Sequence, residues 1–279
     1  MNSEAGATQS DKGQRLRALH QREGAFIIPN PYDAGTALLL EQLGFEALAT
    51  TSSGYAFTRG HRDGELAREQ ALEGVRLIAE AVDIPVSADL ENGFGDGPEV
   101  AAETIRMAAA GGAVGGSIED STKHDEEPIY DVGLAAERVG AAAEVSRGLP
   151  FPFTLTARAE NFLYGRRDLA DTIRRLQAYQ EAGADVLYAP GLITKEEIAA
   201  VVRSVDRPVN VLTGLKGMQL TQADLSALGV RRISVGGGLC RAALGTFVRA
   251  AREMKESGTF AWAADAVGSL SEMTARFDR

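Results

Sequence analysis

Two acidic residues, Asp89 and Glu91, stand two positions apart at the end of a short apolar run. In an extended backbone, side chains two positions apart point to the same side, so both carboxylates can bind one cation. Paired carboxylates that face an oxygen-rich ligand are typical of sites for hard cations, with Mg²⁺ preferred and Mn²⁺ as an alternative. An isolated pair of this spacing is more often part of a solvated loop. The interpretation therefore depends on what the other apolar runs carry.

Polar residues of related types follow or end three further apolar runs. They are Glu119 and Asp120, Arg158 and Glu160, and Asn210 with Thr213. Acids that meet in one place repel one another, so such a cluster implies a bound cation or a shared proton. A divalent ion held by Asp89, Glu91 and Glu119 would polarise a carbonyl or stabilise an enolate oxygen. Arg158 could pair with a substrate carboxylate or with the same oxyanion, or it could form a structural ion pair with a neighbouring acid.

Short apolar runs alternate regularly with stretches of helical composition. The expected strands are 25–28, 45–50, 84–88, 113–118, 153–157, 185–189, 208–212 and 232–235. The expected helices are 14–22, 37–43, 67–82, 98–110, 133–146, 169–182, 195–202, 222–228 and 241–256. Eight such units at this length predict an α/β fold, a (β/α)₈ TIM barrel, in which the carboxyl ends of the strands carry the chemistry. An open doubly wound sheet is the alternative, but no G-x-G-x-x-G follows the first strand.

The expected organisation is a disordered tail over 1–12, one barrel domain over 13–257 and a helical extension over 258–279. The extension carries large apolar side chains, namely Phe260, Trp262, Leu270, Met273 and Phe277. Such groups must be buried, either against their own barrel or against a partner subunit. We favour a partner, which predicts a homodimer or homotetramer with the C-terminal helix swapped between subunits.

Composition excludes several classes of protein. The chain has 279 residues, 44% of them hydrophobic, and a net charge of −10, which argues against nucleic acid as a partner. The single cysteine, Cys240, rules out an internal disulfide and is expected to be a small buried hydrophobe. The first residues are polar, and no apolar run is long enough to span a membrane, so a cytoplasmic location is expected.

The motifs together resemble the isocitrate lyase/phosphoenolpyruvate mutase superfamily over residues 26–256. The matching stretches are Pro29-Asn30-Pro31-Tyr32-Asp33-Ala34, Gly44-Phe45, Thr51-Ser52-Ser53-Gly54 with Gly60 and Asp63, Asp89-Leu90-Glu91-Asn92-Gly93-Phe94-Gly95, Ile118-Glu119-Asp120 and Ala157-Arg158-Ala159-Glu160. The resemblance implies a (β/α)₈ barrel that binds Mg²⁺ and a small 2-oxo acid or dicarboxylate. It further implies cleavage or formation of a C–C or P–C bond through an enolate-like intermediate, and exchange of the last helix between subunits.

The resemblance also implies roles for individual residues. Asp89, Glu91 and Glu119 would hold the metal, although Glu91 stands where an aspartate is usual. Arg158 would stabilise the enolate oxygen, and Asp63 matches an acid close to the metal. Candidate substrate-binding residues are Ser53 and Gly54, which would take the carboxylate, with Tyr55, Arg158 and Asn210.

Departures from the family pattern narrow the reaction. The segment 121–131 lacks the cysteine that serves as the acid in the lyase branch, which argues against cleavage of isocitrate or methylisocitrate. It is also shorter than the gating segment of the phosphonopyruvate-processing branch. A Mg²⁺-dependent C–C lyase such as an oxaloacetate decarboxylase is left, with His124 or Tyr130 as a candidate proton donor.

Three alternatives stay open at this point. One is P–C chemistry of the phosphonopyruvate hydrolase or phosphoenolpyruvate mutase type. Another is a protein that binds 2-oxo acids without turning them over. The third is a barrel for a phosphorylated sugar, suggested by the glycines at 214–217 and 236–238.

Overall fold

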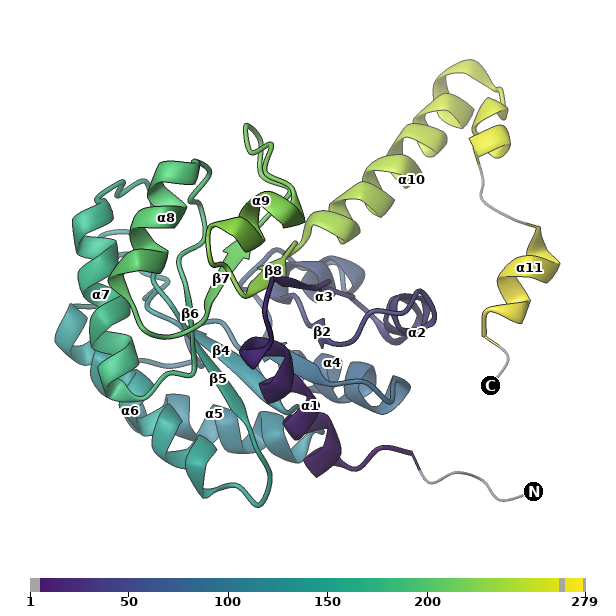
Figure 1. Ribbon diagram of the computed structural model, residues 1–279. Coiled ribbons are helices and arrows are strands. Elements are labelled where there is room, and N and C mark those ends of the chain that lie inside the picture. Colours follow the sequence, from purple (N-terminus) through teal and green to yellow (C-terminus); the bar gives the residue numbers. More distant parts are fainter. Residues whose placement is uncertain (1–5, 266–268, 278–279) are drawn as a thin grey trace.

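The computed structural model describes residues 6–265 and 269–277, and within them eight parallel strands form a nearly closed barrel flanked by helices (Figure 1). The strands are β1 (Phe26–Ile28), β2 (Leu48–Ala49), β3 (Val86–Asp89), β4 (Gly115–Glu119), β5 (Thr154–Arg158), β6 (Val186–Tyr188), β7 (Val209–Leu212) and β8 (Arg232–Ser234). The sheet order is β1-β8-β7-β6-β5-β4-β3-β2. One backbone hydrogen bond, from Ala49 N to the carbonyl oxygen of Pro29 at 3.0 Å, links its two ends. The predicted α/β TIM barrel is therefore confirmed.

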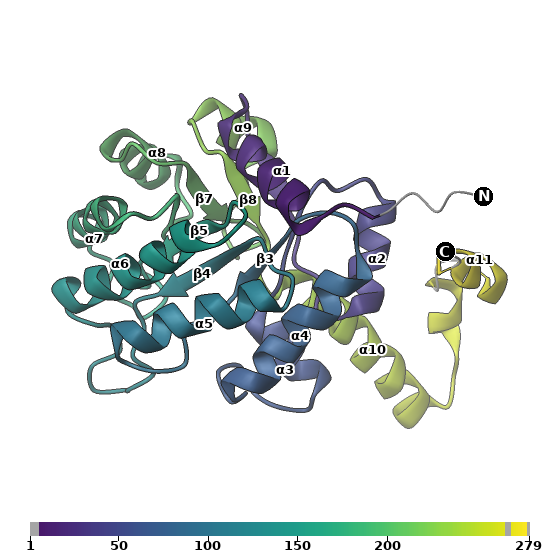
Figure 2. The same ribbon diagram turned by 90° about the horizontal axis from the view of Figure 1, so that it is seen from below.

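Helices connect the strands and cover the outside of the sheet; Figure 2 shows α4, α5 and α6 along it. The helices that follow the first five strands are α2 (Ala34–Gln42), α3 (Ser52–Thr58), α4 (Arg68–Ala81), α5 (Pro98–Ala110), α6 (Val132–Gly148) and α7 (Leu169–Ala182). The remaining helices of the barrel are α8 (Lys195–Ser204), α9 (Gln222–Ala227) and α10 (Gly238–Ser257). Each expected strand and helix of the barrel therefore exists, with boundaries shifted by a few residues.

Alternation along the strands separates an apolar outer layer from a polar interior. Ala88, Ile118 and Leu187 face outward and belong to the main hydrophobic core beneath the helices. Their strand neighbours point inward, and near the carboxyl ends these are polar, as Ser117 and Tyr188 illustrate. Because side chains of a strand alternate between its two faces, one short run supplies both core and site.

Helix α1 (Gln9–Gln21) closes the end of the barrel opposite the strands' carboxyl ends. Its Leu16 and Leu19 pack with Phe26 and Val114, close to where two strands begin. The helix starts at Gln9 rather than near residue 14, because Thr8 and the first turn form a capping box. Residues 9–12 of the expected tail are therefore helical, and residues 1–5 lie outside the described residues.

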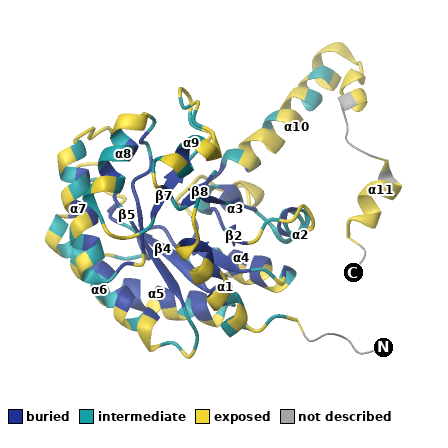
Figure 3. Ribbon diagram, in the orientation of Figure 1, coloured by how far each residue is buried: buried dark blue, intermediate teal, exposed yellow. Residues whose placement is uncertain are grey.

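The C-terminal part leaves the barrel. Of the twenty residues of α10, all of them described, only Cys240 is buried, and the helix projects away from the other elements (Figure 3). A short 3₁₀ helix (Ala261–Asp265) and α11 (Leu270–Ala275) follow. Phe260, Trp262, Met273 and Phe277 are exposed in the single chain. No helix among the described residues is both long and apolar enough to cross a membrane.

Candidate active site

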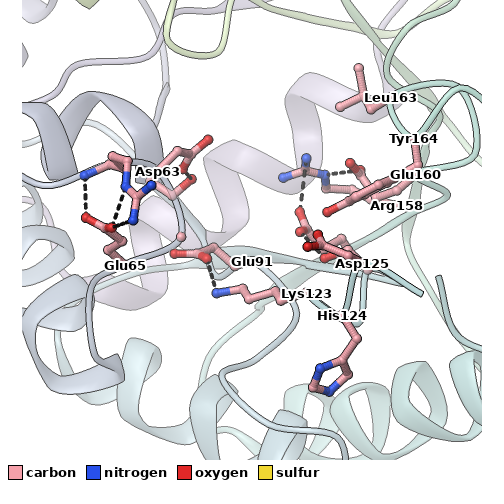
Figure 4. A pocket seen from close by; sticks show the side chains of 15 residues that line it. Asp63, Glu65, Glu91, Lys123, His124, Asp125, Arg158, Glu160, Leu163 and Tyr164 are labelled. Atoms are coloured by element: carbon pink, nitrogen blue, oxygen red, sulfur yellow. Dashed lines mark hydrogen bonds and ion pairs between the residues drawn. The ribbon is translucent and has the colours of Figure 1, made fainter. Parts of the chain in front are cut away.

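A cavity of about 630 Å³ opens at the carboxyl ends of β3, β4 and β5 (Figure 4). Its lining includes Asp63, Glu91, Glu119, Lys123, His124, Arg158, Glu160 and Tyr164. The parallel register brings these ends together, since Glu119 pairs with Arg158 across β4 and β5. The acids and the arginine, which follow separate apolar runs in the sequence, thus meet at the carboxyl ends of these strands. We call this edge of the barrel the rim.

Arg158 lies at the centre of the rim and contacts three carboxylates at once. Its Nη1 lies 3.0 Å from Asp89 Oδ1, its Nη2 3.0 Å from Glu119 Oε2, and its Nε 3.0 Å from Glu160 Oε1. The guanidinium is only 13% exposed, so it is fixed in place by these bonds. Arg158 thus forms the structural ion pairs that were the alternative to a role in substrate binding. These ion pairs hold one edge of the guanidinium toward the cavity.

Burial and crowding perturb the acids around Arg158. Burial raises the pKa of Glu119 and Asp63, and the nearby charge of Asp89 raises both further. Burial also raises the pKa of Glu160 to about 8. The Ser121 hydroxyl donates to Glu119 Oε1 at 2.6 Å, which favours the ionised form of that carboxyl. One guanidinium cannot neutralise three carboxylates, of which Glu160 is buried and Asp89 and Glu119 are partly exposed, so the rim favours an additional positive charge.

Glu91 takes part in a separate ion pair. Its backbone has a φ of 49°, in the left-handed region, and its carboxylate accepts from the Lys123 ammonium. Burial raises the pKa of Glu91 to about 7, while Lys123 opposes that rise. Lys123 comes from the segment 121–131, which is joined at its ends by a bridge between Ser121 and Ile129. This segment therefore places a cation against the second acid of the Asp89–Glu91 pair.

Helix α3 is not among the helices expected from the sequence, and its first turn borders the cavity. Thr51 caps the helix, and Ser52 N donates to Asp89 Oδ2 at 3.0 Å. The Ser52 hydroxyl donates to Asp63 Oδ1 at 3.1 Å, which brings Asp63 to the same rim. The positive end of the helix dipole at this N-terminus attracts anions, in keeping with a carboxylate site near Ser53.

The other candidates of α3 lie deeper. Gly54 is buried, and a Cβ there would lie 2.6 Å from Thr51 Cγ2 and 2.8 Å from Tyr32 Cβ. Tyr55 packs against Gly74 of α4, away from the two cavities that contain Asp89 or Glu119 together with Arg158. Tyr55 instead lines a small cavity of about 10 Å³ behind the rim, together with Asp89 and Glu91. Gly54 fits as a residue that permits the tight turn.

A narrower cavity of about 180 Å³ continues from the rim into the barrel. It is lined by polar side chains of several strands, including Ser87, Ser117, Tyr188, Asn210 and Ser234. Asn210 donates through Nδ2 to Ser234 Oγ at 3.0 Å and accepts from Arg232 Nε at 2.9 Å. The structure thus places Asn210 inside the barrel, below the cluster at the rim.

Three predicted or neighbouring polar residues have different surroundings. His124 is exposed and lines the edge of the large cavity. The Tyr130 hydroxyl donates to Asp96 Oδ1 at 2.6 Å and lines neither the large cavity nor the narrow one, so the structure does not bring Tyr130 to the rim. Burial raises the pKa of Tyr130 to about 12. Asp120 turns away from Glu119 and accepts from Tyr179 and Arg175, which makes it a structural residue.

The donor set at the rim fits a hard divalent cation. Among the described residues no three His, Cys, Asp or Glu side chains form a preassembled metal cluster. Mg²⁺ is usually held by one or two carboxylates, with waters and substrate oxygens completing its shell, so such a cluster is not required. Glu91 and Glu119 line the large cavity and Asp89 lines the narrower one, and the excess negative charge of the three carboxylates favours a cation.

Several residues of the rim have no role that was predicted from the sequence. They are Ser52, Ser121, Lys123 and Glu160. Glu160 was visible as an acid two positions after Arg158, a spacing that returns its side chain to the same side of an extended chain. Lys123 is a basic residue within an acidic segment, which only weakly indicates a role at the site. Its ion pair with Glu91 depends on a backbone φ of 62° at Lys123, which the sequence does not predict.

Comparisons with known proteins place this geometry in context. The family model for phosphoenolpyruvate phosphomutase matches residues 16–255. A crystal structure of a candidate lyase/mutase from Burkholderia cenocepacia J2315 is 57% identical, covers 97% of both chains and has a TM-score of 0.94. Phosphonopyruvate hydrolase of Variovorax sp. (strain Pal2) is 30% identical over 94% of this chain and 93% of that protein. A structure of phosphonopyruvate hydrolase in complex with oxalate and Mg²⁺ is 28% identical, covers 95% and 94% of the two chains and has a TM-score of 0.83.

Proposed function

The chain belongs to the phosphoenolpyruvate mutase family of the isocitrate lyase/phosphoenolpyruvate mutase superfamily, and from that premise we propose that it is a Mg²⁺-dependent lyase. Its substrate is a small 2-oxo acid, and its reaction is C–C cleavage through an enolate, as in decarboxylation of oxaloacetate. The observation that carries the proposal is the buried Arg158, held by three carboxylates at the carboxyl ends of adjacent strands. The family includes lyases, mutases and hydrolases, so an enzyme is the common expectation.

Some residues of the rim would bind the metal and the substrate, and others would stabilise the negative charge of the enolate. Asp89, Glu91 and Glu119 would hold Mg²⁺, which when bound supplies a positive charge for the 2-oxo group. Arg158 points its N–H groups along the same rim and stabilises the negative oxygen of the enolate, where its fixed geometry costs no reorganisation. Ser53, at the start of α3, receives the substrate carboxylate.

Protonation of the enolate requires an acid or a water molecule near the rim. His124 borders the large cavity, where an imidazole is a suitable proton donor, whereas the buried Tyr130 hydroxyl donates to Asp96. Lys123, whose ammonium already lies against Glu91, is a second group from the same segment. We assign the donor to this segment, with His124 in preference to Tyr130.

A second candidate is cleavage of a P–C bond, as in phosphonopyruvate hydrolysis. The specific observation in its favour is the relative from Variovorax, a phosphonopyruvate hydrolase that is 30% identical over nearly the whole chain. Both reactions use a 2-oxo acid and an enolate, so the same rim serves either one. The products differ, which makes the choice experimental.

The test measures release of pyruvate, glyoxylate and phosphate from a panel of 2-oxo acids and 2-hydroxy tricarboxylates. We expect Mg²⁺-dependent pyruvate from oxaloacetate above the rate with free Mg²⁺, abolished by excess chelator. Glu119→Ala is expected to lower kcat/KM by about 100-fold or more, because it removes a metal ligand and a partner of Arg158. Glu126→Ala, which removes an exposed acid of the segment 121–131, serves as the matched control.

Each other outcome points to a different function. Phosphate from phosphonopyruvate alone would establish the hydrolase reaction. Full activity of Glu119→Ala would refute the assigned metal site. No turnover across the panel, with binding of 2-oxo acids retained, would establish a binding protein without catalysis.

A further inference from the structure

The narrow cavity inside the barrel contains a charged group that the proposed reaction does not use. Arg232 is the first residue of β8 and is 4% exposed. Its register partner on β7 is Asn210, so both side chains point into the barrel interior. The same cavity reaches Asp89 and Arg158 at its upper end, which makes it continuous with the metal site.

The guanidinium of Arg232 is only partly satisfied. Its Nε donates to Asn210 Oδ1 at 2.9 Å, but its Nη1 is buried and has no hydrogen-bond partner. Burial lowers the pKa of Arg232 to about 10, so the group stays protonated at neutral pH. Throughout residues 6–265 and 269–277 no acidic side chain forms an ion pair with it. Arg232 is therefore a buried cation without a counter-charge.

An unpaired charge in a protein interior is costly, and such groups are normally paired. Water could occupy the cavity and accept from Nη1, but it would leave the positive charge uncompensated. The three carboxylates at the rim form ion pairs with Arg158, and none of them forms one with Arg232. The missing component is an anion that enters from outside.

The size of the cavity limits what that anion can be. Its volume of about 180 Å³ lies below the 300–1,000 Å³ that is typical of sites for drug-sized ligands. A carboxylate is compact, planar and matched to the donors of a guanidinium. One end of a small metabolite therefore fits, with the other end at the rim.

We infer that Arg232 forms an anion subsite inside the barrel, which binds a second carboxylate of the substrate while the 2-oxo acid end lies at the metal site. The inference rests on the proposed function, because it takes the metal and the 2-oxo group to lie at the rim. It narrows the substrate to a dianion long enough to extend from Asp89 to Arg232. Arg232 is thus a specificity-determining residue.

This placement predicts a particular kinetic signature. In decarboxylation of oxaloacetate, the carboxylate bound by Arg232 is the one that leaves as CO₂ while its charge moves to the enolate oxygen, so the ion pair stabilises the ground state more than the transition state. Loss of the contact with Arg232 should therefore raise KM without lowering kcat. A residue that merely supported the fold near Arg158 would lower kcat as well.

The experiment compares two ligands in the presence of Mg²⁺ by calorimetry. Oxalate is short and uses both carboxylates at the metal, whereas 3,3-difluorooxaloacetate has a carboxylate that can reach further. For Arg232→Met we expect at least a tenfold loss of affinity for 3,3-difluorooxaloacetate and less than a threefold change for oxalate. Arg231→Met is the matched control, since Arg231 is the preceding residue and donates instead to the carbonyl of Arg22 on the outside.

Two results would overturn the subsite. One is unchanged affinity of folded Arg232→Met for 3,3-difluorooxaloacetate, and the other is an equal loss for both ligands. If the variant does not fold, the wild-type protein decides: it must bind 3,3-difluorooxaloacetate at least tenfold more tightly than pyruvate, and equal affinities refute the subsite.

The outcomes separate this inference from the lyase proposal. Absence of turnover with an Arg232-dependent preference for the longer dianion refutes the lyase and retains the subsite. Chelator-sensitive turnover of oxaloacetate with unchanged KM in Arg232→Met retains the lyase and refutes the subsite.

Discussion

At the scale of single residues, the Glu91–Lys123 pair shows how strongly the rim depends on charge. Burial raises the pKa of Glu91 to about 7, above the ordinary value of 4.5. Between these values the folded protein binds more protons than the unfolded chain, so the free energy of unfolding falls as the pH rises. Bound Mg²⁺ would favour the ionised form and oppose this loss.

Glu91→Gln should therefore remove part of the pH dependence of stability in metal-free protein. In excess chelator, we expect the free energy of unfolding of the wild type, relative to Glu91→Gln, to fall by up to about 3 kcal/mol between pH 4.5 and pH 8. Urea unfolding at a series of pH values measures this difference. Glu126→Gln, at an exposed position, should follow the wild type, and identical pH profiles for all three proteins would contradict the prediction.

The sequence predicted the residues that sit directly at strand ends and missed those that depend on loops. Asp89, Glu119 and Arg158 were correctly expected at one rim, because parallel strands bring their carboxyl ends together whatever the loops do. Lys123 reaches Glu91 only through the path of its segment. Tyr130 was expected near the rim, but its hydroxyl donates to Asp96, a contact that the local sequence does not predict.

At the scale of elements, α3 is the clearest difference between expectation and structure. Its residues include two serines, a glycine and a threonine, which have low helix propensity, and no helix was expected there from the sequence. The helix forms because Thr51 caps it and Tyr55 packs against the Cα side of Gly74 in α4. Tertiary contacts thus override local preference, whereas the long amphipathic helices α4 and α8 were predicted from pattern alone.

The position of α3 depends on the absence of a side chain at Gly54. In Gly54→Ala the new Cβ would lie 2.6 Å from Thr51 Cγ2 and 2.8 Å from Tyr32 Cβ, so the first turn must move away from the rim. We expect about 1–3 kcal/mol lower stability and at least a tenfold higher KM for the 2-oxo acid. Chemical unfolding and steady-state kinetics measure the two effects.

Gly148→Ala provides the control for a glycine substitution in a helix. Gly148 ends α6, and a Cβ there would meet no atom within 4 Å. Its stability should be unchanged or slightly higher, because alanine restricts the unfolded chain. Equal kinetic behaviour of the two variants would show that α3 does not position the substrate.

At the scale of the whole molecule, one sheet serves two purposes through the alternation of its side chains. The outward residues build the apolar core with the helices, and the inward residues form a polar channel that runs from the acidic rim to Arg232. A sequence pattern of short buried strands predicts the barrel but not this channel. Apolar and polar residues are mixed within strands only two to five residues long. Which of them face the helices and which face the barrel interior depends on the register of all eight strands.

Helix α10 exposes more apolar surface than a single subunit can readily keep in water. Leu244, Phe247 and Val248 are 41%, 70% and 50% exposed, and the helix extends beyond the barrel. Exposed apolar clusters of this kind mark interaction surfaces. We expect the full chain to be a homodimer or homotetramer, with α10 and the segments after it packed on a partner subunit.

Phe247→Ser should shift the mass measured by light scattering toward the monomer, while Arg249→Ser, on the opposite side of the same helix, should not. A monomeric wild type at micromolar concentration would refute this arrangement, and an unchanged mass for Phe247→Ser would show that another surface holds the subunits together.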